Sequence, residues 1–218
     1  MLELLAAGGM AMIPIGMAAI MTLAIVVERF WSLRRIEVLP PHLTAEVKAW
    51  ALQNRRLDEN HLQALAKTSP LGEVFAAALR VRHLGREAVK ERVEDAGRHV
   101  MHGLERFLNT LGTIALIAPL LGLLGTVIGL IRMFLAVMTH GIGDANQMAG
   151  GIGEALVCTA SGLVVAIPAY IMHRYFRGTV VGLGVDMERE VIALVDSMDA
   201  EPPAAVAAAA AAARRATK

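Results

Sequence analysis

LGTIALIAPLLGLLGTVIGLIRMF, residues 111–134, is the stretch that decides the fold of this chain. It lies in an uncharged run, residues 107–131, that is long enough to cross a bilayer core as a helix rising about 1.5 Å per residue. Gly125 and Gly129 lie one helical turn apart, and this spacing lets a second helix approach the backbone closely. A helix that faced only lipid would need no such glycines. The stretch therefore predicts a membrane helix packed into a larger assembly, with Thr126 on the packed face.

The composition of the chain indicates a membrane protein with a polar portion. Of its 218 residues, 56% are hydrophobic and 4% aromatic, and the mean hydropathy is +0.53. A soluble domain of this length is less apolar. The net charge of +1 comes from interspersed acids and bases rather than a basic patch, so no nucleic-acid partner is indicated. The single cysteine, Cys158, excludes an internal disulfide and is interpreted as a small packing residue.

Two further uncharged runs, residues 4–27 and 155–172, predict additional membrane helices. Basic residues follow the first run rather than precede it, which is typical of a retained anchor and not of a cleaved signal peptide. Between the first two spans, Ser69 and Pro70 predict a helix N-cap followed by proline at the first helical position. No further proline occurs before Pro119, so we expect a long helix to run from Pro70 straight into the second span.

The predicted fold is an all-α membrane protein whose three transmembrane helices are extended by long cytoplasmic helices. Of the 21 Lys and Arg residues, 14 lie between residues 28 and 106 and six lie from residue 174 onward. The positive-inside rule then places the N-terminus outside and the C-terminus in the cytoplasm. The predicted order is a first transmembrane helix (1–30), a cytoplasmic helical domain (31–105), a second transmembrane helix (106–138), a short periplasmic loop (139–150), a third transmembrane helix (151–176), a cytoplasmic helix (177–200) and a low-complexity tail (201–218).

Glu154 is the acid that lies closest to the start of the third span, which we expect to begin near Gly151 or Gly153. A carboxylate in a membrane is costly, so one interpretation is a functional site that faces protein or water. The alternative is that Glu154 lies in the first turn of the helix and favours the positive end of the helix dipole. Arg132 likewise has two interpretations, either ending the second span with its head at the interface or pairing with Glu154 or Asp144.

Thr126 and Thr159 are the next candidates for a functional site. A threonine in a membrane helix commonly bonds its own backbone one turn earlier, and this interpretation stays open for both residues. Thr159 lies about 140° round the helix from Glu154, so the third span has two faces turned towards protein or water. The face with Thr159 also holds small residues, which favour tight helix contact. The residues predicted to pack helices are Gly122, Gly125, Gly129, Gly162, Pro119 and Pro168.

The sequence indicates no enzyme. It contains no phosphate-binding loop, nucleophile elbow or catalytic triad pattern. His99 and His102 are three residues apart on a predicted helix, but without further ligands they do not predict a metal site.

Three segments resemble a known family. APLLGLLGTVIGLIRMF (118–134) and GIGEALVCTASGLVVAIPAY (151–170) are similar to the paired signatures of the MotA/TolQ/ExbB proton-channel family, and VVERFWSLRR (26–35) is similar to its ExbB and TolQ branch. Flagellar stator subunits of the family have four spans, so three spans fit ExbB first and TolQ second.

The resemblance implies a subunit of a proton-driven motor in the bacterial inner membrane. Five copies are expected to form a ring in the lipid around the single-span helices of an ExbD/TolR-like partner that carries the essential aspartate. The motion is passed to a TonB- or TolA-like protein, with protons as the coupling ion and no other cofactor. Carried over by motif position, Thr126, Glu154 and Thr159 match pore-lining polar residues. His173 and Arg174 depart from the family pattern, which leaves the polar contacts at the cytoplasmic mouth open.

Two other classes of protein remain as alternatives. One alternative is a passive scaffold whose ring only houses the partner helices, with Glu154 a structural acid. A substrate transporter is disfavoured because the three spans contain no internal repeat.

Overall fold

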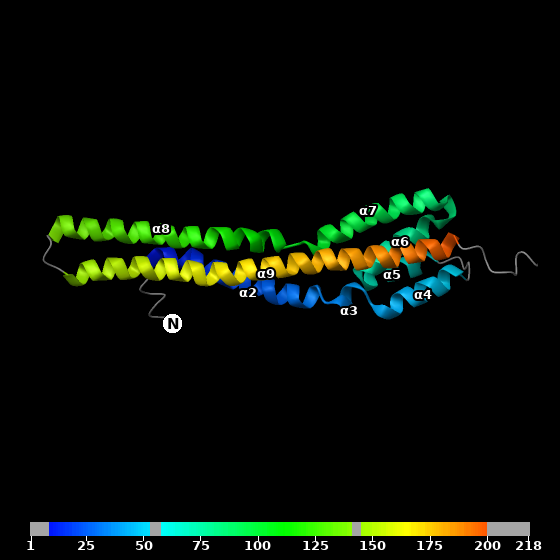
Figure 1. Ribbon diagram of the computed structural model, residues 1–218, viewed down its shortest axis with the longest axis horizontal. Helices are drawn as coiled ribbons and strands as arrows, with labels where there is room; N and C mark the ends of the chain where they lie inside the picture. The colour runs from blue at the N-terminus through cyan, green and yellow to red at the C-terminus, as the bar shows by residue number, and fades with distance from the viewer. Residues whose placement is uncertain (1–8, 53–57, 141–144, 200–218) are drawn as a thin grey trace, which may run out of the picture. The chain divides into compact units, whose positions relative to one another are not determined.

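The structure, a computed structural model, describes residues 9–52, 58–140 and 145–199. Within them the chain forms helices of widely different length and no strand (Figure 1). In order these are η1 (Gly9–Ala11), α2 (Met12–Ser32), α3 (Arg35–Val38), α4 (Pro41–Leu52), α5 (Glu59–Thr68), α6 (Pro70–Val81), η2 (Arg82–Leu84), α7 (Arg86–Leu104), α8 (Leu108–His140) and α9 (Ala145–Asp199). The all-α class predicted from the sequence is confirmed.

Three helical segments are long and apolar enough to cross a membrane: Gly9–Ser32, Arg86–Thr139 and Met148–Ser197. Less than a third of the most apolar window in each segment is buried inside the chain. The three predicted membrane helices are therefore present as helices, and most of their apolar surface is left for lipid or for other chains.

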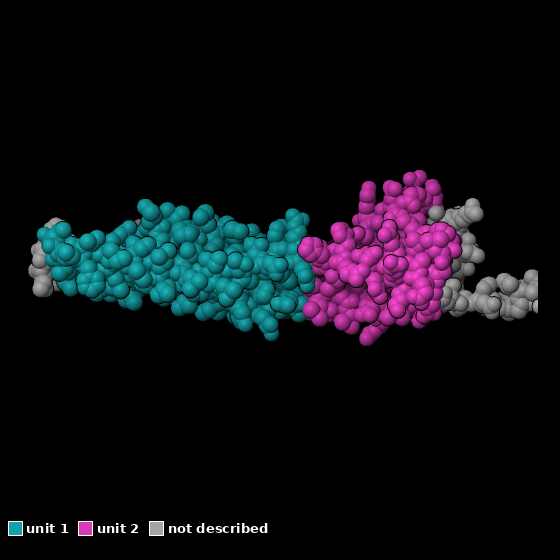
Figure 2. Space-filling view, turned by 90° about the horizontal axis from the view of Figure 1, so that it is seen from above, with its two compact units in different colours: residues 1–31, 105–178 teal, residues 32–104, 179–218 magenta. Residues whose placement is uncertain are grey.

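Backbone contacts divide the chain into two compact units (Figure 2). Unit 1 comprises residues Met1–Trp31 and Glu105–Gly178, and unit 2 comprises Ser32–Leu104 and Thr179–Lys218. The predicted low-complexity tail, residues 201–218, lies outside the described residues, as do residues 53–57 of the predicted cytoplasmic domain and residues 141–144 of the predicted periplasmic loop.

In unit 1, helix α2, helix α8 and the first part of α9 lie side by side, with α8 and α9 antiparallel (Figure 1). Met12 and Ile15 of α2 form a buried cluster with Cys158 of α9. The interpretation of Cys158 as a packing residue agrees with its complete burial. At the other end of α2, the ring of Phe30 packs edge-on against Phe176, with the ring centroids 5.2 Å apart.

In unit 2, α6 is the buried centre of a small helical bundle. Phe75 and Ala78 are fully buried, and α6 packs against α5 and α7. Its start confirms the prediction from the sequence, because the Ser69 hydroxyl accepts a hydrogen bond of 3.1 Å from the Gly72 amide and Pro70 occupies the first turn.

The prediction of one long helix from Pro70 into the second span is wrong. The chain leaves the helix after Val81 and turns at Gly85, whose φ of 95° is open to glycine and strained for other residues. It turns again between α7 and α8, where Phe107 has a φ of 63°. The Phe107 ring lies beneath the guanidinium groups of Arg29 and Arg106, at 5.6 and 4.5 Å from its centroid, and these contacts offset the unfavourable backbone.

Helix α9 begins at Ala145, before the glycines at which we expected the third span to start. It continues without interruption past Pro168 to Asp199. The expectation that the helix continues beyond the third span is therefore confirmed.

Candidate functional site

The candidate site is built on a glycine seam, defined as the line of close approach between α8 and α9 at Gly122, Gly125, Gly129 and Gly162. All four glycines are buried. A Cβ atom placed on Gly162 would lie 2.6 Å from the carbonyl oxygen of Ala118 and 3.1 Å from the Cα atom of Gly122. These are backbone atoms that cannot rotate aside, so the two helices touch through their main chains.

The same close approach extends along both helices. A Cβ atom on Gly125 would lie 2.5 Å from the Cβ atom of Cys158, and one on Gly129 would lie 3.1 Å from the carbonyl oxygen of Gly151. The four glycines predicted to pack helices therefore lie at the contact between the two apolar spans. Pro119 is half-buried beside Ala118, whereas Pro168 is exposed within the single chain.

Thr159 lies in the seam and reaches across it. Its hydroxyl donates a hydrogen bond of 3.3 Å to the carbonyl oxygen of Gly122 on α8. The interpretation that Thr159 bonds its own backbone is therefore wrong, because the glycine brings the neighbouring carbonyl within reach.

Thr126 lies one turn along α8 from this contact. Its hydroxyl donates to the carbonyl oxygen of Leu123 at 2.6 Å, which is the local back-bond that the sequence left open. Thr159 thus bonds Gly122 across the seam, and Thr126 lies one turn further along α8, with a hydroxyl oxygen of each still able to accept a hydrogen bond.

Glu154 is not at the start of its helix. Since α9 begins at Ala145, Glu154 lies beyond the first turn, and the interpretation that it favours the helix dipole there is wrong. Its Oε1 atom instead accepts a hydrogen bond of 2.7 Å from Nη1 of Arg132 on α8. Of the two interpretations of Arg132, the ion pair with Glu154 is the one seen; Asp144 lies outside the described residues.

Gly9 lies against the ion pair of Arg132 and Glu154, and Gly9 was not identified from the sequence as part of the site. Its φ is 61°, and a Cβ atom on Gly9 would clash with the Glu154 carboxylate, because it would lie 1.9 Å from Oε1. The available signal was Gly9 itself at the start of a membrane helix, but a span's sequence does not tell which neighbour its glycine touches.

His173 stands at the other end of the seam. Its Nε2 atom would lie 3.0 Å from a Cβ atom on Gly112, so the imidazole occupies the space that this glycine leaves open on α8. The departure from the family pattern at this position therefore places a polar ring between the two spans.

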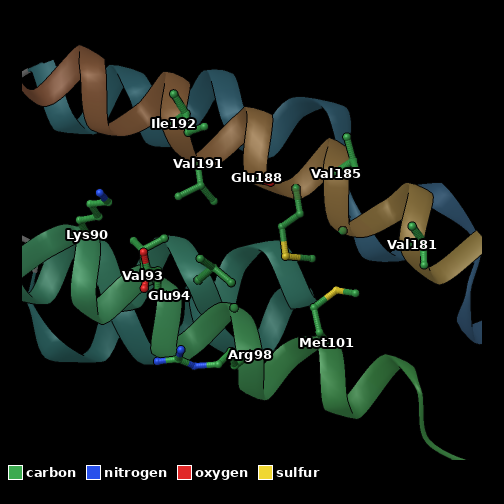
Figure 3. Close-up of a pocket in the computed structure, with 14 residues that line it drawn as sticks. Lys90, Val93, Glu94, Arg98, Met101, Val181, Val185, Glu188, Val191 and Ile192 are labelled. Atoms are coloured by element: carbon green, nitrogen blue, oxygen red, sulfur yellow. The ribbon is translucent and has the colours of Figure 1, made fainter.

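Unit 2 contains a separate groove of about 650 Å³ between α7 and α9, and Val74 of α6 also lines it (Figure 3). Figure 3 shows Val93 of α7 and Val191 of α9 pointing into the space between the two helices, with Glu94 on α7 and Glu188 on α9. In the part of the chain that the structure describes, no three or more His, Cys, Asp or Glu side chains cluster in a way that could hold a metal ion.

The sequence of the chain matches a known protein family. The sequence profile of the MotA/TolQ/ExbB proton channel family matches residues 66–189, which cover most of α6 to α9.

Several curated relatives carry the ExbB name. A putative biopolymer transport protein ExbB-like 1 from Synechocystis is 34% identical over 77% of this chain and 66% of its own length. A putative ExbB homolog from Methanothermobacter thermautotrophicus is 30% identical over 90% of this chain and 68% of its own. The biopolymer transport protein ExbB of Neisseria gonorrhoeae is 33% identical over 59% of this chain and 53% of its own, so the chain spans about half to two thirds of these relatives.

Proposed function

Because this chain belongs to the MotA/TolQ/ExbB proton channel family, we propose that it is a ring-forming subunit of a proton-driven motor in the bacterial inner membrane. The motor energises an outer-membrane process through a TonB-like protein, as in systems of the ExbB type. The observation that carries the proposal is the seam itself: two apolar helices touch through glycine backbones and place the hydroxyl group of Thr159 at the contact.

The proposed assembly is a ring of five copies around the transmembrane helices of an ExbD/TolR-like protein. The exposed apolar surface of the three spans supports association with lipid and with further chains. The distribution of basic residues supports a periplasmic N-terminus and a cytoplasmic C-terminus, since Arg29, Arg106, Arg174 and Arg177 flank the spans on one side.

The proposed mechanism uses a carboxylic acid from the partner. Protons enter from outside and neutralise this carboxylate near Thr126 and Thr159, after which it passes the apolar surface of the spans. Hydroxyl groups suit this role because they bond a carboxyl group in either protonation state. Moving one elementary charge through 100 mV provides about 2.3 kcal/mol, so a few protons per step bias a rotation.

The substitution Thr159→Val tests this role. We expect the variant to lose proton-driven work in cells that also produce the single-span partner, while the ring assembles normally. Thr113→Val is the matched control, because the Thr113 hydroxyl donates to its own helix at Asn109 and is exposed. Full activity of Thr159→Val, or equal losses in both variants, would contradict the proposal.

A TolQ-type role in outer-membrane maintenance and a passive scaffold are the other candidates. The ion pair between Glu154 and Arg132 favours a structural part for Glu154 and so gives the scaffold specific support. Replacing Thr126 by Val and Glu154 by Gln, with assembly and proton-driven work measured separately, distinguishes a motor subunit from a passive scaffold. If the chain is only a scaffold, proton-driven work persists in every variant whose ring still forms.

A further inference from the structure

The two spans that form the seam carry one charge each. Arg132 is the only Lys, Arg, Asp or Glu residue of α8, and Glu154 is the only one between Ala145 and Met172 of α9. These two residues meet at 2.7 Å. An ionised side chain in a membrane span is costly unless it is paired, so each residue supplies the partner that the other requires.

The pair is held from a third side by η1. Gly9 lies against the Glu154 carboxylate so closely that a methyl group could not be added, and the Nη1 atom of Arg132 would lie 3.2 Å from that methyl group. The side chain of Glu154 is 20% exposed, whereas that of Arg132 is 49% exposed. We call this arrangement of Gly9, Arg132 and Glu154 the charged clasp.

The clasp determines where the carboxylate points. Glu154 and Thr159 lie about 140° apart round α9. The carboxylate held on Arg132 meets α8 beside Gly9 of η1, whereas the Thr159 hydroxyl meets α8 at Gly122. Without Arg132, the carboxylate would lose its cation within an apolar span and would turn to whatever polar group or water it could reach.

We propose that Arg132 is a positioning residue that fixes the carboxylate of Glu154 against Gly9, and that this orientation is required for proton-driven work. The inference rests on the proposed function and deepens it by adding two residues, Arg132 and Gly9, to the machinery. Glu154 then acts as a fixed charge beside the seam, while the hydroxyl groups of Thr126 and Thr159 meet the mobile acid of the partner.

The first test compares substitutions of Arg132. We expect Arg132→Gln to lower proton-driven work by about tenfold or more, because small displacements of a site group have effects of that order. Arg132→Lys keeps the cation and is expected to restore most of the work. Arg92→Gln is the matched control, since Arg92 is exposed on α7. If Arg132→Lys does not restore proton-driven work, or if Arg132→Gln retains full proton-driven work, the positioning role is overturned.

The second test approaches the same carboxylate from η1. Gly9→Ala places a methyl group where Oε1 of Glu154 lies and is expected to reduce work as Arg132→Gln does. Gly16→Ala is the control, because nothing lies within 4 Å of a Cβ atom there. Equal activity of the two alanine variants overturns the proposal.

A third measurement separates failure of the clasp from failure of the proposed function. The purified full-length protein in lipid nanodiscs is melted as wild type, Arg132→Gln, Glu154→Gln and the double variant. We expect the two single substitutions to lower the melting temperature by more, in sum, than the double variant does. If the shifts in melting temperature are additive, Arg132 and Glu154 do not interact, and the charged clasp is rejected whether or not proton-driven work is observed. Non-additive shifts in a protein that drives no proton-dependent work leave the clasp in place and reject the motor.

Discussion

Gly162→Ala is the substitution that tests the glycine seam most directly. The new methyl group would lie 2.6 Å from the carbonyl oxygen of Ala118, whereas ordinary contact begins at 3.4 Å, so α8 must retreat by about 0.8 Å. That movement would lengthen the hydrogen bond from Thr159 to Gly122, now 3.3 Å, to about 4 Å and so break it.

The magnitude follows from three contributions. Overpacking a close contact costs about 1–3 kcal/mol, and the lost hydrogen bond costs about 0.5–1.5 kcal/mol. Replacing glycine by alanine within a helix returns about 0.5–1 kcal/mol. We therefore expect Gly162→Ala to reduce the free energy of unfolding by between about 0.5 and 4 kcal/mol.

Gly153→Ala is the matched control on the same helix, because nothing lies within 4 Å of a Cβ atom at that position. It is expected to stabilise the protein by about 0.5–1 kcal/mol. The assay is equilibrium unfolding of the full-length protein in mixed micelles, followed by circular dichroism. If Gly162→Ala is as stable as Gly153→Ala, the helices do not meet through their backbones at this point and the seam is wrong.

The other predictions concern unit 2. Ser69→Ala removes the N-cap of α6 and should lower the free energy of unfolding by about 1 kcal/mol, while Thr68→Ala, whose hydroxyl bonds its own helix on the surface, should change it much less. Gly85→Ala should destabilise by about 1–3 kcal/mol because its φ of 95° strains any side chain. Gly97→Ala, within helix α7 and with open space around a Cβ atom, should stabilise by about 0.5–1 kcal/mol. Thermal or denaturant unfolding that gave the same sign for Gly85 and Gly97 would contradict the assignment of a turn at Gly85.

Local signals in the sequence were sufficient for the elements that depend on local chemistry. The uncharged runs predicted three apolar helices because the length of a helix follows from its residue count, and Ser69 with Pro70 predicted a helix start because a cap acts within one turn. The turn at Phe107 could not be predicted in this way. The Phe107 ring packs against two arginines, and Arg29 comes from a helix far away in the sequence.

The candidate site divides in the same way. The amino-acid sequence was enough to establish that two apolar spans carry glycines, hydroxyl groups and one charge each, because residue type and spacing are all that such a count requires. The packing of the helices was needed to show that Thr159 bonds the Gly122 carbonyl, that Arg132 bonds Glu154, and that Gly9 lies against this pair. The reason is physical: a helix fixes the angle at which a side chain leaves its axis, whereas the atom that it meets depends on the register and separation of a second helix.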